Sequence, residues 1–194
     1  MANRKSGLKS KKAKEPVIEI KPVNTSPVFA NAMLILALSV ILKTGLFALS
    51  YHESIVGRFS ILLVLLFLLI GLFRTIDQLR QSKPDKKIQF VEGFKAGARV
   101  VFLISAGYSL FIWFYYSKID VSFFDRLIDA RINEGLGRGI DAKELENYRK
   151  SAQIMLSASS QSFFTFIGLL VGGIVYAYVI TWLMIKKYRE KQFS

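Results

Sequence analysis

The chain has 194 residues, a formal net charge of +13, an apolar content of 52% and a positive mean hydropathy. It contains no cysteine, which excludes disulfides, thiolate nucleophiles and Cys-ligated metals. Its one histidine, His52, leaves little scope for His-based metal sites or acid–base catalysis. The length suits one domain of ordinary size.

Four apolar segments are long enough to cross a bilayer, which requires roughly 20 helical residues. They cover about residues 28–50, 55–76, 96–116 and 163–185. A soluble helical bundle shows a polar residue every third or fourth position, and these segments do not. The first segment is longer than the roughly 7–15 apolar residues of a signal peptide, so we expect it to be retained. The sequence therefore predicts an all-α polytopic membrane protein with four transmembrane helices.

The predicted membrane domain covers residues 28–190, between a basic tail at 1–27 and a short tail end at 191–194. The tail at 1–27 is polar, and we expect it to be disordered. The third link, at 117–162, is the only soluble-like segment within the membrane domain.

Basic residues alternate along the chain as four spans require. The net charge is +5 before the first span, 0 in the first link, +4 in the second, 0 in the third and +3 after the last span. The positive-inside rule then places both termini and the second link in the cytoplasm, and the 117–162 loop outside. This predicts a bacterial inner membrane protein whose cytoplasmic side meets anionic lipid head groups.

Lys43 is the only ionisable residue well inside a predicted span. Its long side chain is expected to extend to the outer interface, and the alternative is a pair with an acid such as Asp120 or Glu53. No Asp or Glu lies in the core of any span, and no histidine accompanies the intramembrane serines. We therefore assign no catalytic, cofactor-binding or metal-binding residue, and we expect neither an enzyme nor a cofactor. These intramembrane serines are Ser39, Ser105 and Ser109.

Small residues four positions apart form strips on which two membrane helices can approach closely. The sequence leaves open which helix packs against them. The candidate helix-packing residues are Gly93, Gly97, Gly168, Gly172, Gly173 and Ala177. Trp113, Tyr115 and Tyr116 are expected in the aromatic belt at the outer interface.

The 117–162 loop predicts an amphipathic helical hairpin with one apolar stripe. The glycine-rich stretch at 135–139 separates its helices, and Asp141 begins the second one with Glu144 in capping-box spacing. The stripe either lies on the membrane or caps the bundle, or it offers a surface to a protein partner. That candidate partner surface consists of Phe124, Leu127, Ile128, Leu145 and Tyr148.

The N-terminal tail has a dense run of basic residues at Lys9, Lys11, Lys12 and Lys14. We interpret this run as a topology anchor. The alternative is a contact with ribosomal RNA or another acidic partner. Nucleic acid is not expected elsewhere, because the other basic residues flank the spans.

Residues 90–136 resemble the core of an uncharacterised family of small four-span inner-membrane proteins, a domain-of-unknown-function family. The resemblance rests on Phe90 and Phe94 before Gly97, and on an aromatic-rich span that ends in Ile119 and Asp120. The family commonly has a proline after that pair, whereas this chain has Val121. The resemblance implies four spans and a helical outward loop, and it implies no activity.

These features favour a non-catalytic accessory or scaffold subunit of a larger membrane complex, with a membrane-protein partner or a second copy of the chain. One alternative is a small transporter or lipid-handling protein that uses Lys43 and the serines. A further alternative is a ribosome- or translocon-associated factor that acts through the basic tail.

Overall fold

A computed structural model describes residues 26–51, 54, 57 and 59–190. The described residues are almost entirely helical and contain no strand. The helices are α1 (Ser26–Ala48), α3 (Ser60–Gln81), α4 (Phe90–Phe114), the π-helical turn η1 (Tyr115–Ile119), α5 (Phe123–Gly137), α6 (Ala142–Met155) and α7 (Ala158–Glu190).

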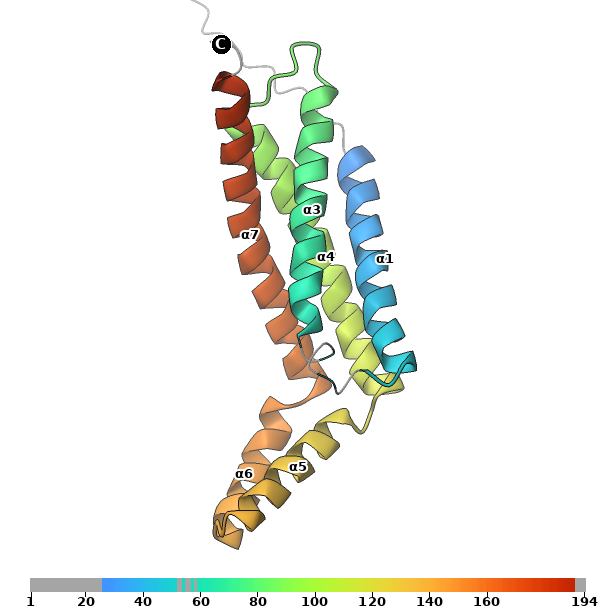
Figure 1. The fold of residues 1–194 in the computed structure, drawn as a ribbon, viewed down its shortest axis with the longest axis vertical. Coiled ribbons are helices and arrows are strands. Elements are labelled where there is room, and N and C mark those ends of the chain that lie inside the picture. The colour runs from blue at the N-terminus through green and yellow to red at the C-terminus, as the bar shows by residue number, and fades with distance from the viewer. Residues whose placement is uncertain (1–25, 52–53, 55–56, 58, 191–194) are drawn as a thin grey trace, which may run out of the picture.

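The four long helices α1, α3, α4 and α7 stand side by side and alternate in direction (Figure 1). The shorter helices α5 and α6 form a hairpin that projects from one end of this bundle, which we call the hairpin end. The α3–α4 loop and the end of α7 lie at the opposite end. The sequence therefore predicted both the four long helices and the hairpin correctly.

All four long helices are long and apolar enough to cross a membrane, over Pro27–Ala48, Ser60–Gln81, Phe90–Ile119 and Ala158–Lys187. The protein is thus a multi-pass membrane protein. Two helices begin five or six residues earlier than predicted. At the start of α4, the backbone N–H of Gln89 donates to Oε2 of Glu92 over 3.1 Å, which closes the first turn and extends the helix beyond its apolar part.

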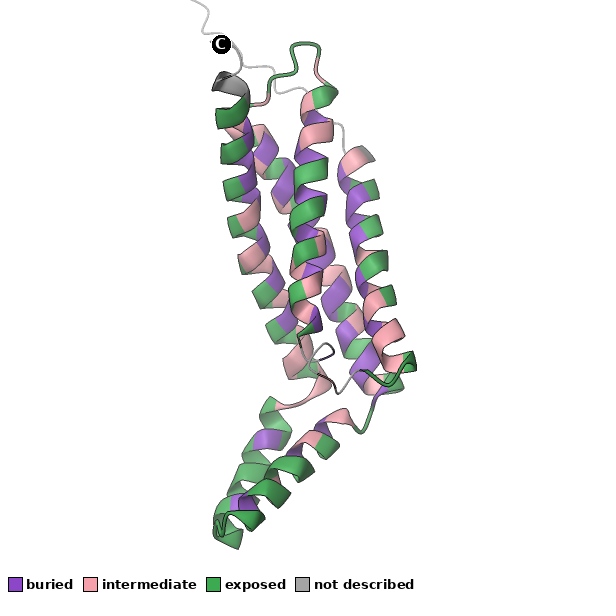
Figure 2. Ribbon diagram, in the orientation of Figure 1, coloured by how far each residue is buried: buried purple, intermediate pink, exposed green. Residues whose placement is uncertain are grey.

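Burial in the bundle follows one stripe on each helix (Figure 2). Leu68, Leu72 and Ile76 of α3 pack with Val100 and Ile104 of α4 in the main core cluster. Large apolar side chains also cover the outside of the bundle, for example Leu62, Leu66, Ile70, Val171 and Val175. An exposed apolar surface of this extent is typical of a protein that faces lipid.

The hairpin is held together by packing and by one ion pair between its helices. Gly135 of α5 lies against Leu145 of α6, and a Cβ added to this glycine would be 2.6 Å from the leucine Cδ2. Arg149 donates to Asp129 over 2.7 Å across the two helices. Asp141 is the N-cap of α6, as predicted, and its carboxylate accepts from the backbone N–H of Lys143 over 3.1 Å.

Candidate functional site

The predicted small-residue strips pack mainly between α4 and α7, which share the most extensive interface in the described structure. A Cβ added to Gly93 would be 2.8 Å from Cγ2 of Thr181, and one added to Gly97 would be 2.9 Å from Cβ of Ala177. At these positions a side chain on the glycine has no space unless the neighbour moves. The strips thus bring the backbones of α4 and α7 close together.

The glycines of α7 differ in their surroundings. Gly173 faces Val101 of α4, and an added Cβ would be 2.6 Å from Cγ1 of that valine. Gly172 faces Leu65 of α3 at an ordinary contact distance, and nothing lies within 4 Å of the position of a Cβ on Gly168. Only part of the predicted packing set is therefore used inside the described structure.

Helix α1 also packs closely against glycines of α3 and α4 that were not among the predicted packing residues. Gly71 of α3 lies directly against Ile35 of α1. A Cβ added to Gly107 of α4 would be 2.8 Å from Cδ2 of Leu36. Gly71 is isolated in an apolar run, whereas Gly107 follows the small residues Ser105 and Ala106; neither forms a glycine pair at four-residue spacing.

Lys43 does not reach the surface of the protein, contrary to the expectation that its side chain would extend to the interface. It is 7% exposed, and its Nζ lies 5.2 Å and 5.5 Å from the ring centroids of Tyr115 and Tyr116. The ammonium also lies within coulombic reach of Asp120. Asp120 thus influences Lys43 through space without an ion pair between the two, and Glu53, the other acid considered, lies outside the described residues.

Tyr115 and Tyr116 also differ from the expectation of an aromatic belt, because they are buried rather than at the surface. They lie in the π-helical turn η1, which continues α4 towards the hairpin. The Phe124 ring of α5 packs 4.8 Å from the ring of Tyr116 and helps to cover it. Trp113, which precedes this turn, is exposed as an interfacial aromatic residue would be.

Asp120 is the acid at the centre of this end of the bundle. It follows η1, is 4% exposed and accepts a hydrogen bond from Arg126 of α5 over 2.8 Å. Asp120 thus lies near two basic groups, the guanidinium of Arg126 and the ammonium of Lys43. A buried carboxylate in such a position is stabilised by its charged neighbours.

A half-enclosed cavity of about 590 Å³ lies between the hairpin end of the bundle and α5. Its wall is mostly apolar and aromatic, with a few polar groups. Helices α1, α3, α4, α5 and α7 all contribute, and its lining includes Ile61, Tyr108, Ile112, Tyr116, Phe123, Phe124, Leu127, Ala130, Leu156 and Phe164 together with Ser60, Gln161 and Thr165. Size and lining are typical of a small-molecule site, for which volumes are roughly 300–1,000 Å³.

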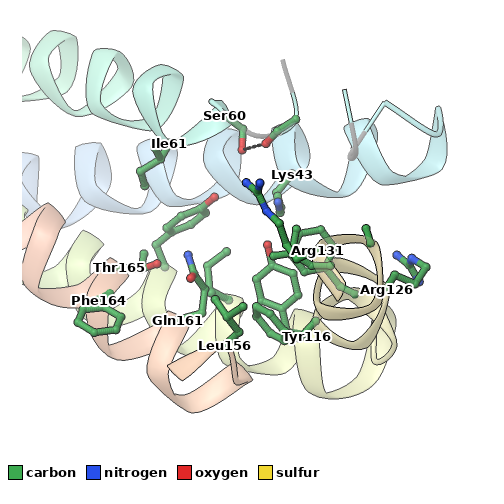
Figure 3. A pocket seen from close by; sticks show the side chains of 17 residues that line it. Lys43, Ser60, Ile61, Tyr116, Arg126, Arg131, Leu156, Gln161, Phe164 and Thr165 are labelled. Carbon is green, nitrogen blue, oxygen red and sulfur yellow. Dashed lines mark hydrogen bonds between the residues drawn. The ribbon is translucent and has the colours of Figure 1, made fainter. Parts of the chain in front are cut away.

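Within the described part of the chain, the charged side chains that line this cavity are Lys43, Arg126 and Arg131, all of them basic. In the view of Figure 3, Lys43 and Arg131 project onto the same part of the lining, and the guanidinium of Arg126 points away from the other labelled side chains. Ile61 and Phe164 lie towards the other end (Figure 3). The cavity therefore combines a basic end with an apolar end.

Arg131 was missed at the sequence level, although the sequence contains a signal for it. It follows Phe124 by seven residues and Leu127 by four, so it lies in line with the apolar stripe of α5. An arginine on an apolar stripe is unusual, because its charge then faces the same neighbours as the apolar side chains.

The predicted partner surface on the hairpin is used largely within the protein. Phe124, Ile128 and Leu145 are buried, Leu127 lines the cavity, and Tyr148 is exposed. Phe124, at the start of the first hairpin helix, therefore covers the end of the bundle at Tyr116, and Leu145 packs inside the hairpin against Gly135. Binding of a protein to this stripe stays a prediction.

Two of the three intramembrane serines donate hydrogen bonds to backbone carbonyls of their own helices. Ser39 donates to the carbonyl of Ile35 over 2.8 Å, and Ser109 donates to that of Ala106 over 3.0 Å. Ser105 is buried, and its hydroxyl has no hydrogen-bond partner within the described residues. Neither Ser39 nor Ser105 lines the cavity, so a path that uses these serines receives no support from the cavity lining.

The basic run at Lys9, Lys11, Lys12 and Lys14 lies outside the described residues, so its role as an anchor or a contact stays a prediction. Within the described residues, no group of three or more His, Cys, Asp or Glu side chains is placed to hold a metal ion.

Residues 30–187 match the family described as protein of unknown function (DUF4199), and the chain belongs to this family. This confirms the resemblance to a domain-of-unknown-function family that Phe90, Phe94 and Gly97 indicated. No curated protein and no solved structure matches the chain. The family description gives no activity, so the function has to be argued from the cavity.

Proposed function

We propose that this membrane protein handles lipids by binding an amphiphilic molecule in the cavity at the hairpin end. The observation that carries the proposal is the cavity itself, which has an apolar wall at one end and basic side chains at the other. An amphiphile matches both ends of such a site, because its chain buries apolar area and its head group meets the polar residues.

The position of the cavity supports a ligand that comes from the bilayer. Phe164 of α7 lines the cavity and is also exposed on the outside of the bundle, where lipid is expected. Ile61 of α3 lines the same wall and is partly exposed. We propose that a chain enters the cavity from the lipid phase past these two residues, without crossing the packed core of the bundle.

The proposed role is binding and not catalysis. Among the described residues, the cavity is lined by one serine and one threonine, Ser60 and Thr165, and by no histidine, aspartate or glutamate. The hydroxyl of Ser60 already donates to the carbonyl of Gly57 over 2.8 Å. A serine nucleophile requires an adjacent base to accept its proton.

The proposed orientation follows from the charges that flank the helices. The basic second link and the end of α7 lie together opposite the hairpin (Figure 1). The positive-inside rule favours the cytoplasm for that end and the outer side for the hairpin and its cavity. We accordingly propose an inner-membrane location with the ligand drawn from the outer leaflet.

A cavity-filling substitution tests whether the cavity is the binding site. Ala130 of α5 is exposed and lines the cavity, so Ala130→Trp is expected to occupy the site without entering the bundle core. Asn133→Trp is the matched control, because Asn133 is exposed on the same helix and is not among the lining residues. Native mass spectrometry of protein purified in a mild non-ionic detergent measures co-purified lipid.

We expect a lipid-sized mass adduct on the wild type and on Asn133→Trp, and its loss from Ala130→Trp. The same amount of adduct on all three proteins would contradict binding in this cavity. Absence of any adduct from the wild type, after incubation with a total lipid extract of the host membrane, would contradict the proposed function.

The second candidate function is an accessory subunit of a larger membrane complex. Ile154 and Met155, at the end of α6, are 77% and 64% exposed, and Tyr148 of the same helix is also exposed. Exposed apolar residues on a helix outside the four spans favour contact with a protein or with the membrane surface.

Affinity purification from membranes solubilised in digitonin tests the accessory role. A stoichiometric membrane-protein partner or a second copy of the chain is expected with the wild type and is expected to be lost with the double variant Ile154→Ser and Met155→Ser. A monomer that retains its lipid and has no partner would contradict the accessory role and leave the lipid-handling role in place.

A further inference from the structure

We infer that the ligand has an anionic head group and that Lys43 and Arg131 bind it. This inference rests on the proposed function, because it assigns the chemical class of the amphiphile in the same cavity. The ligand class is a fatty acid or a phosphate-bearing lipid, whose shared chemistry is an anionic oxygen head group on an acyl chain.

The segment at 117–162 contributes basic side chains to the cavity although its net charge is zero. Residues 117–162 contain seven basic and seven acidic residues, so this segment has no net charge. Nevertheless the segment contributes Arg126 and Arg131 to the cavity and no acid. A neighbouring hollow on the other side of Arg126 is lined by Asp120 and Asp125. The fold therefore separates the basic lining from the acidic residues of the same segment.

The ammonium of Lys43 is buried beside the cavity, where a bound anion would stabilise its charge. Its side chain is almost fully buried, and burial of an ammonium is costly unless an opposite charge or an aromatic face compensates. Tyr115 and Tyr116 supply aromatic faces, and Asp120 supplies negative charge. Asp120 also accepts a hydrogen bond from Arg126 over 2.8 Å.

Arg131 is in a similar position on the exposed side of the cavity. Its Nη1 lies 3.2 Å from Oε2 of Glu134, while Arg138 binds the other oxygen of the same carboxylate over 2.6 Å. The carboxylate of Glu134 is thus shared between Arg131 and Arg138. An added anion would complete this arrangement, and a guanidinium is well suited to bind a carboxylate or phosphate with two parallel hydrogen bonds.

The apolar end of the cavity determines where the chain lies. Ile61 and Phe164 line the cavity away from Lys43 and Arg131 in the view of Figure 3, so a head group at the two basic residues directs its chain along these apolar residues. Each methylene buried there contributes about 0.8 kcal/mol. A free anion without a chain lacks this contribution, so the site is expected to bind inorganic phosphate weakly.

Four probes that differ in their anionic group and in their palmitoyl chain distinguish the possible ligands. They are palmitate, palmitoyl lysophosphatidic acid, the neutral monopalmitoylglycerol and inorganic phosphate. Binding to purified, delipidated protein in a non-ionic detergent at pH 8 is measured by native mass spectrometry and by microscale thermophoresis. At least one of the two anionic palmitoyl probes is expected to bind at least tenfold more tightly than monopalmitoylglycerol, and their ranking distinguishes a carboxylate from a phosphate source.

Two substitutions with matched controls identify the residues that bind the head group. Lys43→Met and Arg131→Gln are each expected to weaken binding of the preferred anionic probe roughly tenfold to hundredfold, the size of a lost charge-assisted hydrogen bond, and to leave monopalmitoylglycerol unaffected. Lys118→Met and Arg138→Gln are the controls, because both residues are exposed at the hairpin end and neither lines the cavity. Arg138 and Arg131 both pair with Glu134, so Arg138→Gln measures the effect of losing one ion pair to this carboxylate without changing the cavity lining.

Circular dichroism and unfolding in detergent verify that each variant is folded, and Lys43→Arg is expected to restore anion binding if Lys43→Met loses it. Equal affinity for the neutral and anionic palmitoyl probes would overturn the inference and leave the proposed function standing. Inorganic phosphate that binds as tightly as lysophosphatidic acid would overturn the assignment of an amphiphile. Failure of every palmitoyl probe to bind would overturn both the inference and the proposed function.

Discussion

Helices α4 and α7 behave differently at the two ends of the bundle. Near the end opposite the hairpin, Gly93 and Gly97 of α4 face Thr181 and Ala177 of α7 at close distance. At the hairpin end the same helices instead contribute side chains to a cavity of about 590 Å³, among them Tyr108 and Ile112 from α4 and Phe164 and Thr165 from α7. The comparison shows that small residues close one end of the interface, while large residues and the hairpin leave a lined space at the other.

The largest expected effect is at the buried charges of the hairpin end. Asp120→Asn removes the negative charge that Lys43 and Arg126 share. Removal of one partner from a buried pair costs roughly 3–5 kcal/mol, and we expect about 3 kcal/mol because the side chain of Arg126 is partly exposed. Chemical unfolding in detergent micelles measures the free energy of unfolding.

The control for this change is Asp125→Asn on α5. Asp125 is exposed, so its substitution is expected to change the free energy of unfolding by no more than about 0.5 kcal/mol. If the two variants were equally stable, Asp120 would not be the carboxylate that stabilises this end of the bundle.

The close-packed end is tested on α7 with two glycines of opposite surroundings. Gly173→Ala places a Cβ 2.6 Å from Cγ1 of Val101, and overpacking of this kind costs roughly 1–3 kcal/mol. Gly168→Ala meets nothing within 4 Å, so we expect it to be neutral or to stabilise the helix by up to about 1 kcal/mol. Thermal unfolding in detergent compares the two, and a loss of equal size at both positions would argue against the described α4–α7 interface.

A smaller effect is expected at the polar contact between α1 and α3. The side-chain amide of Asn31 donates to Oγ1 of Thr75 over 3.0 Å and to Oε1 of Gln78 over 2.8 Å. Asn31→Ala is expected to cost about 1 kcal/mol, because hydrogen bonds between membrane helices are individually weak. A double-mutant cycle with Gln78→Ala measures the coupling, and strictly additive costs would show that the two side chains do not interact.

The smallest expected effect is local to the hairpin. Asp141→Ala removes the N-cap of α6 and is expected to cost about 1 kcal/mol, whereas Asp141→Ser retains a capping oxygen. Hydrogen exchange of the α6 amides is expected to become faster with alanine and to change little with serine. Identical exchange in the two variants would show that the cap does not limit the opening of α6.

The sequence predicted the long helices and the hairpin because these features depend on local length, composition and periodicity. It also identified Gly93, Gly97, Gly173 and Ala177 as packing residues, although it left their partner open. The structure adds that α4 and α7 are each other's partners at these positions.

The burial of Lys43 and of the tyrosines at 115 and 116 was not anticipated from the sequence, for one physical reason. Distance along a helix to its end does not reveal what covers that end. Here Phe124, at the start of α5, packs on Tyr116, so residues close to a helix end are buried. The cavity could not be predicted, because its lining comes from helices that are far apart in the sequence.

The most direct test of the proposed role is an experimental structure of the protein purified with its native lipid and without added ligand. The account predicts elongated density in the cavity, with its head near Lys43 and Arg131 and its chain along Ile61 and Phe164. A cavity filled by the protein's own side chains, or one that contains only water, would contradict the proposal.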